Sequence, residues 1–315
     1  MARQERSRGK SFARAFFPVF FLILIVSTIG VFAVDKFGLF GLFGGDIMKD
    51  VTPIAGGDSE FSQRYAESKR INVLLLGQND SLTDTIMMCS FDTENKRVDI
   101  VSVPRDTYYE RSGYEDPAYQ KINSIYGTED VFGIATAVSN VLGGVPIHYY
   151  EILEDQDVAA IVDSMGGVEF DVPIDMKYTD KKQGLYIDIK AGMQVLDGDH
   201  AVQYLRYRKG YATGDIGRVE AQQAFMKEAF KQSIGLGFPK VAKTVFDEVE
   251  SNLNAKMAVR IGTEAVGMTT SDIETYTAPG KSGMENGASY FFIDGSKTAE
   301  LMDTIYSYVR PEEEE

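Results

Sequence analysis

Short apolar runs and helical stripes alternate along the chain from residue 71 onward. INVLLLG (71–77), DTIMMCSFD (84–92) and RVDIVSVP (97–104) are short apolar runs of the kind found in strands of a buried sheet. TENK (93–96) separates the second run from the third and predicts a hairpin turn. DVFGIATAVSNVLGG (130–144) has helical spacing and ends at two glycines, which predicts a helix.

The same alternation continues toward the carboxyl end. Strands and helices that are interleaved in this way predict an α/β fold, an αβα sandwich in which helices cover both faces of the sheet. We expect further strands at HYYEIL (148–153), VEFDV (168–172), LYIDI (185–189), DIETYTAPG (272–280) and SYFFID (289–294), and further helices at 156–167, 197–205, 217–235, 239–252, 257–268 and 296–309.

The first 70 residues have a different pattern. Five cations against one acid occupy residues 1–14, and residues 15–34 contain no charge. Twenty helical residues span about 30 Å, the thickness of the hydrocarbon layer of a membrane. The alternative is a cleaved signal peptide, but its apolar region is about 7–15 residues long. We therefore expect a single transmembrane anchor at 15–34, a cytoplasmic basic tail at 1–14, a linker at 35–70 and an extracytoplasmic domain at 71–310.

Charge and cysteine content indicate which partners and which covalent cross-links the chain is not expected to have. Without the five cations and one acid of the tail, 27 basic and 46 acidic residues remain of the chain's 32 and 47. This excess of acids argues against a nucleic-acid partner. The single cysteine, Cys89, lies in an apolar run and predicts a buried thiol, so the chain can form no internal disulfide.

Four cations are concentrated in the fragment YLRYRKGYATGDIGRVEAQQ (204–223): Arg206, Arg208, Lys209 and Arg218. Arg206 and Arg208 are two residues apart, so on an extended segment both side chains point the same way, about 7 Å apart. Arg218 and Gln222 are four apart at the start of a predicted helix and share a face. Guanidinium groups beside a helix amino terminus form an anion site. The alternative is a solvated loop with ion pairs.

Seven motifs in order carry a family resemblance: LLLG (74–77), TDTI (83–86), SVPRDT (102–107), KIN (121–123), VDSMGGV (162–168), YLRYR (204–208) and DIGRVEAQQ (215–223). This series resembles the LytR-CpsA-Psr family of bacterial cell-envelope proteins. The resemblance implies an extracytoplasmic αβα domain on a single membrane helix. It also implies transfer of an anionic glycopolymer, such as a teichoic acid or capsule, from a polyprenyl-pyrophosphate carrier to peptidoglycan, with Mg²⁺ (or Mn²⁺) at the pyrophosphate.

The resemblance also assigns roles to individual residues. Arg105 follows a predicted strand and is either a pyrophosphate contact or a structural partner of Asp106. Asp84 is either an ion-pair partner or a Mg²⁺ ligand that also accepts the proton of an attacking hydroxyl. The expected set is Asp84, Arg105, Arg206, Arg208 and Arg218 for catalysis, Lys121, Asp215 and Gln222 for substrate, and Asp84 with Asp80 or Asn79 for the metal.

Three departures from the family pattern leave the reaction open. Asn79 stands where relatives have Asp, Leu82 where they have Arg before the metal-binding Asp, and Ala221 where they have Arg. Each lost charge-assisted contact costs about 1.5–3 kcal/mol of phosphate binding. The alternatives to a transferase are a non-catalytic envelope protein that binds prenyl phosphates and a pyrophosphate hydrolase. His148 and His200 lack the spacing of zinc ligands and are expected to be structural.

Overall fold

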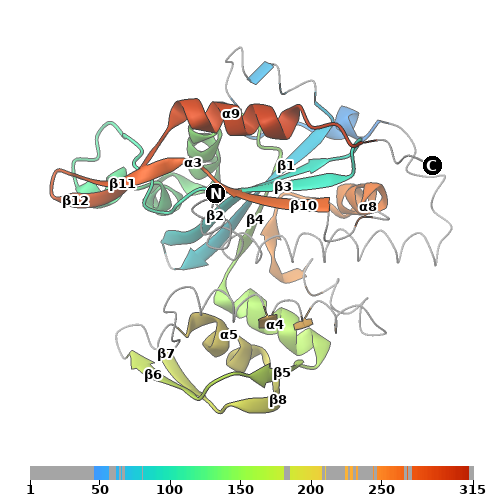
Figure 1. Cartoon of the computed structure of the whole chain (residues 1–315), viewed down its shortest axis with the longest axis vertical. Coiled ribbons are helices and arrows are strands. Elements are labelled where there is room, and N and C mark those ends of the chain that lie inside the picture. Colours follow the sequence, from blue (N-terminus) through green and yellow to red (C-terminus); the bar gives the residue numbers. More distant parts are fainter. Residues whose placement is uncertain are drawn as a thin grey trace, which may run out of the picture.

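The chain folds around a central β-sheet in the computed structural model (Figure 1). The predicted basic tail at 1–14 and the predicted anchor at 15–34 lie outside the described residues. None of the helices that the structure describes is long and apolar enough to cross a membrane. The described residues are 46–56, 62–63, 65, 68–79, 81–180, 185–207, 210, 224–225, 228–229, 232, 244, 247–265, 268 and 272–311.

The central sheet has six strands in the order β10-β3-β2-β1-β4-β9. β2 is antiparallel to both β1 and β3, while β1 pairs in parallel with β4, and β3 in parallel with β10. β1, β3, β4 and β10 therefore point the same way, and their carboxyl ends share one edge of the sheet with the start of β2. The strands are β1 (Arg70–Asn79), β2 (Leu82–Asp92), β3 (Arg97–Ser102), β4 (Tyr149–Leu153), β9 (Glu250–Ser251) and β10 (Ile273–Thr277).

The apolar run predicted as a buried strand forms the middle of this sheet. Ile71, Val73 and Leu75 of β1 point into one core, and Leu74 and Leu76 point into the other. All five side chains are at most 2% exposed. Because successive side chains of a strand face opposite sides, a continuous apolar run fits a strand that is covered on both faces.

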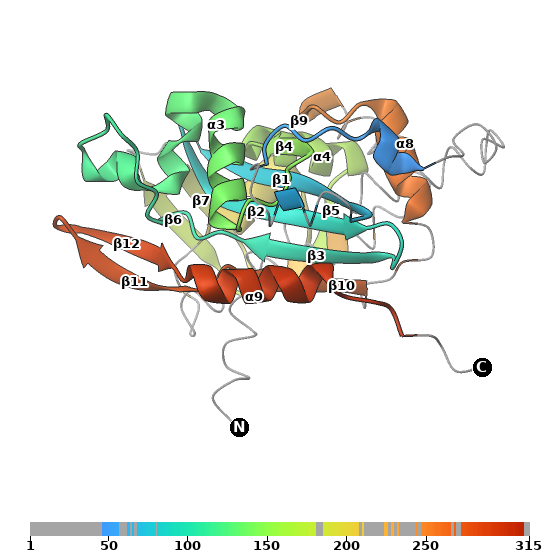
Figure 2. The same ribbon diagram turned by 90° about the horizontal axis from the view of Figure 1, so that it is seen from above.

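Helices cover both faces, as Figure 2 shows from above. α3 (Tyr126–Val141) and α9 (Gly295–Tyr306) pack on one face, and the core there includes residues of both helices such as Val138 and Ile305. The other core includes side chains of α4 (Asp155–Met165), α5 (Gly198–Arg206) and α8 (Ala255–Glu264). The predicted α/β fold with helices on both faces of a sheet is confirmed.

Two small two-stranded sheets accompany α4 and α5 in the lower part of Figure 1. β5 (Val168–Val172) pairs with β8 (Gly192–Leu196), and β6 (Met176–Asp180) pairs with β7 (Leu185–Ile189). The aromatic rings of Phe170, Tyr204 and Phe225 pack together there, with centroids 5.1–5.6 Å apart. α5 begins where the sequence predicts, because the Asp197 carboxylate accepts a hydrogen bond from the His200 N–H.

A further hairpin joins the central sheet to the segment after β3. β11 (Gly280–Glu285) and β12 (Ala288–Ile293) form it, and it extends beyond the sheet in Figures 1 and 2. The Phe291 N–H donates to the Asp106 carbonyl at 2.8 Å, and the Tyr108 N–H donates to the Phe291 carbonyl at 2.9 Å. The hairpin therefore supports the segment that carries Arg105.

The structure corrects several expected elements. The predicted helix at 239–252 does not reach its end, because Glu250 and Ser251 form β9. β6, β8 and β11 were not predicted, because none of them is a continuous apolar run; their pairing with β7, β5 and β12 fixes them as strands. Within the predicted linker at 35–70, Ile47 and Tyr65 are buried in the two cores, so those parts of the segment pack on the domain.

Candidate functional site

Four charged side chains alternate in sign at the carboxyl edge of the sheet. The Arg105 guanidinium lies 2.5 Å from the Asp84 carboxylate and 3.9 Å from that of Asp106. The Lys121 ammonium lies 2.8 Å from the other side of Asp106. The side chains of Asp84 and Arg105 are 33% and 46% exposed, so a ligand in solution can reach them. The structure thus brings together three residues that the sequence predicted for one site.

Local backbone structure explains why these residues meet. Asp84 lies near the start of β2, and Arg105 follows the end of the neighbouring strand β3. We call residues 103–125, between β3 and α3, the site loop. Its two arms run side by side: the Asn123 N–H donates to the Arg105 carbonyl at 3.2 Å, and the Ile122 N–H donates to the Thr107 carbonyl at 2.9 Å. Residues 16 apart in sequence, Arg105 and Lys121, are thereby placed on both sides of Asp106.

Arg206 reaches the same edge from a different element. It is the last residue of α5, and its guanidinium lies 2.7 Å from Asp155, the first residue of α4 after β4. Two strands, β2 and β1, separate β3 from β4 in the sheet. Because neighbouring strands lie about 4.8 Å apart, the ends of β3 and β4 are about 14 Å from each other. Arg206 therefore lies at the same edge as Arg105, with the ends of two strands between them.

The predicted conformation of Arg206 is wrong by one residue. The helix predicted at 197–205 was expected to be followed by an extended segment on which Arg206 and Arg208 point the same way, whereas Arg206 is the last residue of α5. Tyr204 and Leu205 are helical, as predicted, and are buried in the core. The backbone becomes extended only at Tyr207, the C-cap of α5.

Several predicted site residues lie outside the described residues. Asn79 is described at its backbone, where it ends β1 opposite Leu82 of β2. Leu82 and Asp84 are two residues apart near the start of β2, but the register between β1 and β2 shifts between Gly77 and Gln78, so strict alternation of side chains does not extend across Asp84. The predicted residues that the structure does not describe are Asp80, Arg208, Asp215, Arg218 and Gln222.

The carboxylates described at this edge of the sheet supply only part of the ligand shell of a magnesium ion. No group of three or more His, Cys, Asp or Glu side chains that could hold a metal occurs among the described residues. Mg²⁺ commonly takes only one or two carboxylates and completes its shell with water and substrate phosphates. Asp84, exposed and beside cations that attract phosphate, has the chemistry for this role; the carboxyl group of Asp80 lies outside the described part of the chain.

Sequence reasoning missed two residues around the site. Asp155 pairs with Arg206, and its position directly after the strand at 148–153 was the signal that could have found it. Arg111 is buried within the site loop and forms an ion pair with Glu129 of α3. No pattern in the sequence indicated that these two residues would meet. Both contacts join segments that are distant in sequence.

The two histidines have structural contacts. His148 is buried, and its Nδ1 accepts a hydrogen bond from the Asn72 N–H at 2.9 Å. Burial lowers the pKa of His148 to about 4, so the ring is neutral. His200 lies 2.7 Å from the Asp197 carboxylate at the start of α5.

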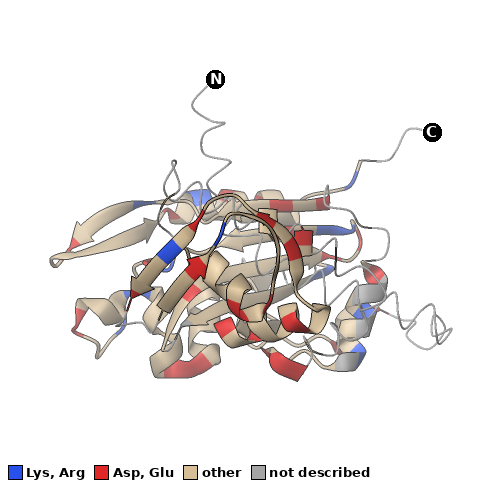
Figure 3. Cartoon of the chain, turned by 90° about the horizontal axis from the view of Figure 1, so that it is seen from below, with Lys and Arg blue, Asp and Glu red and all other residues tan. Residues whose placement is uncertain are grey.

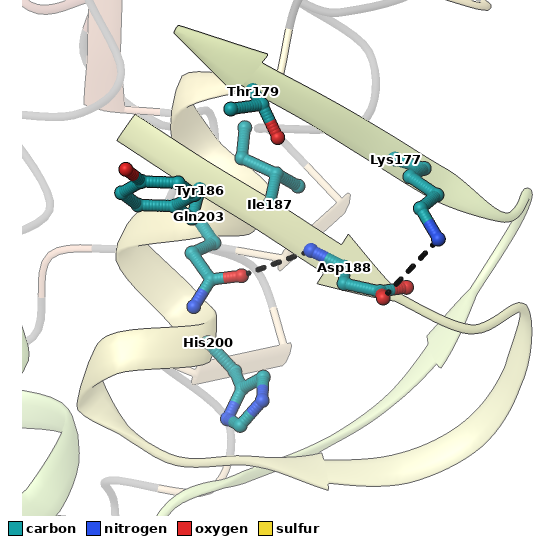
Figure 4. A pocket seen from close by; sticks show the side chains of 7 residues that line it. All are labelled: Lys177, Thr179, Tyr186, Ile187, Asp188, His200 and Gln203. Carbon is teal, nitrogen blue, oxygen red and sulfur yellow. Dashed lines mark hydrogen bonds and ion pairs between the residues drawn. The ribbon is translucent and has the colours of Figure 1, made fainter. Parts of the chain in front are cut away.

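A surface pocket lies elsewhere, on β6, β7 and α5 (Figure 4). Its single Lys or Arg, Lys177, lies 3.7 Å from Asp188. The side chain of Gln203 accepts a hydrogen bond from the Asp188 N–H at 3.2 Å. With one cation already next to a carboxylate, this pocket is a weaker phosphate site than the edge of the sheet. Along the ribbon in Figure 3, positions coloured as Asp or Glu are more frequent than positions coloured as Lys or Arg, in line with the net charge of −15.

Comparison with known proteins agrees with this architecture. Residues 48–306 match the model of the LytR_cpsA_psr family. The chain is 24% identical over 257 residues to the polyisoprenyl-teichoic acid–peptidoglycan teichoic acid transferase TagV of Bacillus subtilis, covering 77% of this chain and 66% of TagV. It is 30% identical over 205 residues to TagU of Bacillus anthracis, a transferase of the same description, covering 62% of this chain and 65% of TagU. Both matches thus span slightly less than two thirds of the relative.

Other relatives and solved structures complete the comparison. The regulatory protein MsrR of Staphylococcus aureus is 27% identical over 236 residues, covering 72% of this chain and 70% of MsrR. The crystal structure of B. subtilis TagV superposes with a TM-score of 0.58 at 23% identity, covering 76% of this chain and 98% of that one. TagT bound to LI-WTA superposes with a TM-score of 0.54 at 21% identity, covering 76% and 91%. These structures show a common fold, and the family match extends over most of the sequence: the chain belongs to the LytR-CpsA-Psr family.

Proposed function

We propose that this protein transfers an anionic glycopolymer from a polyprenyl-pyrophosphate carrier to a hydroxyl group of peptidoglycan. Membership of the family supports the proposal, as do the transferase names of the relatives TagV and TagU. The observation that carries it is the set of cations at the carboxyl edge of the sheet: Arg105 and Lys121 beside Asp84 and Asp106, with Arg206 across two strand ends. A diphosphate between prenyl chain and glycan is an anion that suits such a set.

The reaction follows from these groups. The acceptor hydroxyl oxygen, from the family resemblance that of the muramic acid C6, attacks the phosphorus that bears the glycopolymer. A new P–O bond forms, the bond to the bridging oxygen breaks, and polyprenyl phosphate leaves with that oxygen. Asp84 accepts the hydroxyl proton, and the product is a phosphodiester between glycopolymer and peptidoglycan. Arg105, Lys121 and Arg206 hold the phosphate oxygens and offset the charge that develops on the leaving group.

A divalent cation is part of this proposal. Mg²⁺ or Mn²⁺ held by Asp84, with Asp80 or Asn79, would neutralise phosphate charge and polarise the attacked phosphorus. The exposed carboxylate of Asp84 supports this assignment. The predicted residues Arg208, Arg218, Asp215 and Gln222 complete the proposed anion site from the segment that follows α5.

The proposed location follows from the amino terminus. A basic tail at 1–14 and an uncharged span at 15–34 favour a single membrane anchor, with the amino terminus in the cytoplasm and the domain outside. The carrier is itself a membrane lipid, so an anchored domain meets it at the membrane surface. The partners that we propose are the membrane, the lipid-linked glycan and peptidoglycan.

The test uses the full chain purified in detergent. With Mg²⁺, a lipid-linked glycopolymer and a peptidoglycan fragment, we expect release of polyprenyl phosphate and joining of the glycopolymer to the fragment. Arg206→Ala should lower the rate at least tenfold, because a charge-assisted phosphate contact is worth about 1.5–3 kcal/mol. Lys177→Ala, which removes an exposed cation that is ion-paired on β6 and has no proposed contact with phosphate, is the matched control. Equal rates for wild type and Arg206→Ala would refute this mechanism, and release without an acceptor would indicate hydrolysis instead.

A second candidate function is binding of prenyl phosphates without turnover, in a regulatory protein of the envelope. Leu82 favours it: an apolar side chain, 42% exposed, lies two residues before Asp84 near the start of β2, where the family pattern has an arginine. The relative MsrR carries the name of a regulatory protein. Lipid-phosphate binding with no transfer under any of the assay conditions would support this candidate.

A further inference from the structure

We infer that Arg111 is a positioning residue for the proposed diphosphate site: it fixes the site loop on which Arg105 and Lys121 lie. The inference rests on the proposed function, which assigns phosphate contacts to those two cations. Arg111 itself cannot take part in such contacts. Its side chain is only 4% exposed, in contrast to the half-exposed guanidinium of Arg105.

The guanidinium of Arg111 has all its donors engaged. An arginine side chain carries five N–H groups. The Arg111 side chain donates five hydrogen bonds, and its Cζ lies over the ring of Tyr114, 3.8 Å from the ring centroid. Nε donates to Glu129 Oε1 at 3.0 Å. One terminal nitrogen donates to the Tyr119 carbonyl at 3.1 Å and to Ser124 Oγ at 3.4 Å. The other terminal nitrogen donates to Thr128 Oγ1 at 2.6 Å and to Glu129 Oε1.

These acceptors belong to different parts of the site. Tyr119 and Ser124 flank Lys121 on the second arm of the loop, whereas Thr128 and Glu129 lie in the first turn of α3. The backbone of Arg111 adds to the connection, because its N–H donates to Gln120 Oε1 at 2.9 Å. One buried cation therefore ties the first arm of the loop to the second arm and both to α3.

The first turn of α3 is in turn fixed against the strand pair that carries Asp84. Gly127 packs so closely on Ser81, in the β1–β2 turn, that a Cβ at this position would clash with the Ser81 carbonyl. Thr83 Oγ1 also donates to the Asn123 carbonyl at 3.4 Å. Asp130, directly after Glu129, has a φ of 61°, a strained value for a residue with a side chain. The chain of contacts from Arg111 thus ends beside Asp84.

Removing the guanidinium should loosen the two cations with respect to Asp84. Arg111→Ala leaves the Glu129 carboxylate and three backbone or hydroxyl acceptors without their donor. The arms of the loop then keep their backbone hydrogen bonds, the contact of Gln120 with the backbone of residue 111 and the Lys121–Asp106 ion pair, but they lose the buried connection to α3. Phosphate contacts depend steeply on geometry, so loss of affinity rather than loss of fold is the expected consequence.

The experiment measures binding of inorganic pyrophosphate with Mn²⁺ to the full chain by calorimetry, well below the melting temperature of each variant. We expect Arg111→Ala to weaken binding about tenfold. In an Arg105→Ala/Lys121→Ala background, Arg111→Ala should have no further effect, because it acts through those side chains. Arg97→Ala is the matched control: Arg97 is a partly buried arginine on the same strand that Arg105 follows, paired with Asp99 at the opposite edge. It should lower stability and leave affinity unchanged.

Hydrogen exchange supplies a readout that does not depend on the ligand. Arg111→Ala should speed exchange of the Ile122 and Asn123 amides, which close the loop, and should not change exchange in β1. Wild-type affinity in Arg111→Ala, or an equal loss of affinity with and without Arg105 and Lys121, overturns the positioning role. If wild type binds no pyrophosphate with Mn²⁺, the proposed function fails as well, and the positioning role fails with it.

Discussion

Arg105 and Asp84 form an ion pair of 2.5 Å between the end of β3 and the start of β2, so the proposed phosphate contact and the proposed metal ligand neutralise each other. A phosphate that takes the Nη1 donor of Arg105 competes with the carboxylate, and a metal that takes Oδ1 of Asp84 competes with the guanidinium. Either ligand alone weakens the ion pair, whereas both together provide each side with a new partner. The two ligands should therefore bind cooperatively, with a reciprocal coupling free energy.

Asp84→Asn tests this coupling. In wild type, we expect Mn²⁺ to raise the affinity for pyrophosphate, and pyrophosphate to raise the affinity for Mn²⁺, by the same factor. Asp84→Asn should bind pyrophosphate more tightly than wild type when no metal is present, because Arg105 is released, and it should lose most of the gain from Mn²⁺. Calorimetric titrations with and without metal measure both quantities. Asp188→Asn, at an exposed ion pair on β7, should behave as wild type; an unchanged metal effect in Asp84→Asn would rule the coupling out.

Leu82→Arg should strengthen anion binding. The new guanidinium would lie two residues before Asp84 near the start of β2, in an exposed place that can hold it without burial. A charge-assisted contact predicts about a tenfold gain in affinity for pyrophosphate. Val195→Arg, at an exposed apolar position of the strand β8, controls for the added charge.

Turnover distinguishes the two candidate functions in the same variant series. If wild type transfers no glycopolymer and Asn79→Asp/Leu82→Arg does, the natural protein is a binding protein that lacks part of the catalytic set. Equal pyrophosphate affinity for Leu82→Arg and Val195→Arg would show that position 82 does not face the site.

Glu151 should make stability fall as the pH rises. Its side chain is 1% exposed on β4, Oε2 has no hydrogen-bond partner within the described part of the chain, and burial raises the pKa of Glu151 from 4.5 to about 8. Between pH 4.5 and pH 8 the unfolded chain releases a proton that the folded chain keeps. The contribution of protonated Glu151 to the free energy of unfolding is therefore complete below pH 4.5 and is lost as the pH approaches 8. Glu151→Gln should remove this slope and be more stable than wild type at pH 8 by a few kcal/mol, since each pKa unit is worth about 1.4 kcal/mol.

Urea unfolding at pH 5, 7 and 8 measures the difference. Glu169→Gln, at an exposed position of β5, should leave the slope of the wild type. Parallel pH profiles of wild type and Glu151→Gln would contradict the assignment.

His148 should have the opposite pH dependence. Burial lowers its pKa from 6.5 to about 4, so the unfolded chain takes up a proton below pH 6.5 that the folded chain does not take up. The contribution of His148 to stability should therefore fall as the pH decreases from 6.5 to 4, by a few kcal/mol in total, against the opposite change from Glu151. His148→Gln keeps an acceptor for the Asn72 N–H and should fall less over this range. His200→Gln, at an exposed ring, is the control, and an identical acid profile for His148→Gln would refute the prediction.

The sequence determined the central sheet and much of its cover. Its apolar runs are longer and more continuous than any surface strand tolerates, so β1 and β2 had to be buried strands, and the TENK turn had to join β2 to β3. Asp197 and the alanine and leucine spacing behind it likewise determined α5. Short-range physics governs these features: an apolar segment must be buried, and a cap must satisfy its nearest amides.

Only the tertiary structure decided which charges meet. Arg105 pairs with Asp84 and Arg206 with Asp155 because the strand order places the ends of β3, β2, β1 and β4 along one edge, and no spacing in the sequence encodes that order. Arg206 was expected in an extended segment after the helix predicted at 197–205, and it is instead the last residue of α5. Arg111 was not expected at all, since its four acceptor atoms come together only when the site loop closes on α3. Ion pairs between distant segments depend on the packing of the whole sheet, whereas the elements that carry them depend on their own residues.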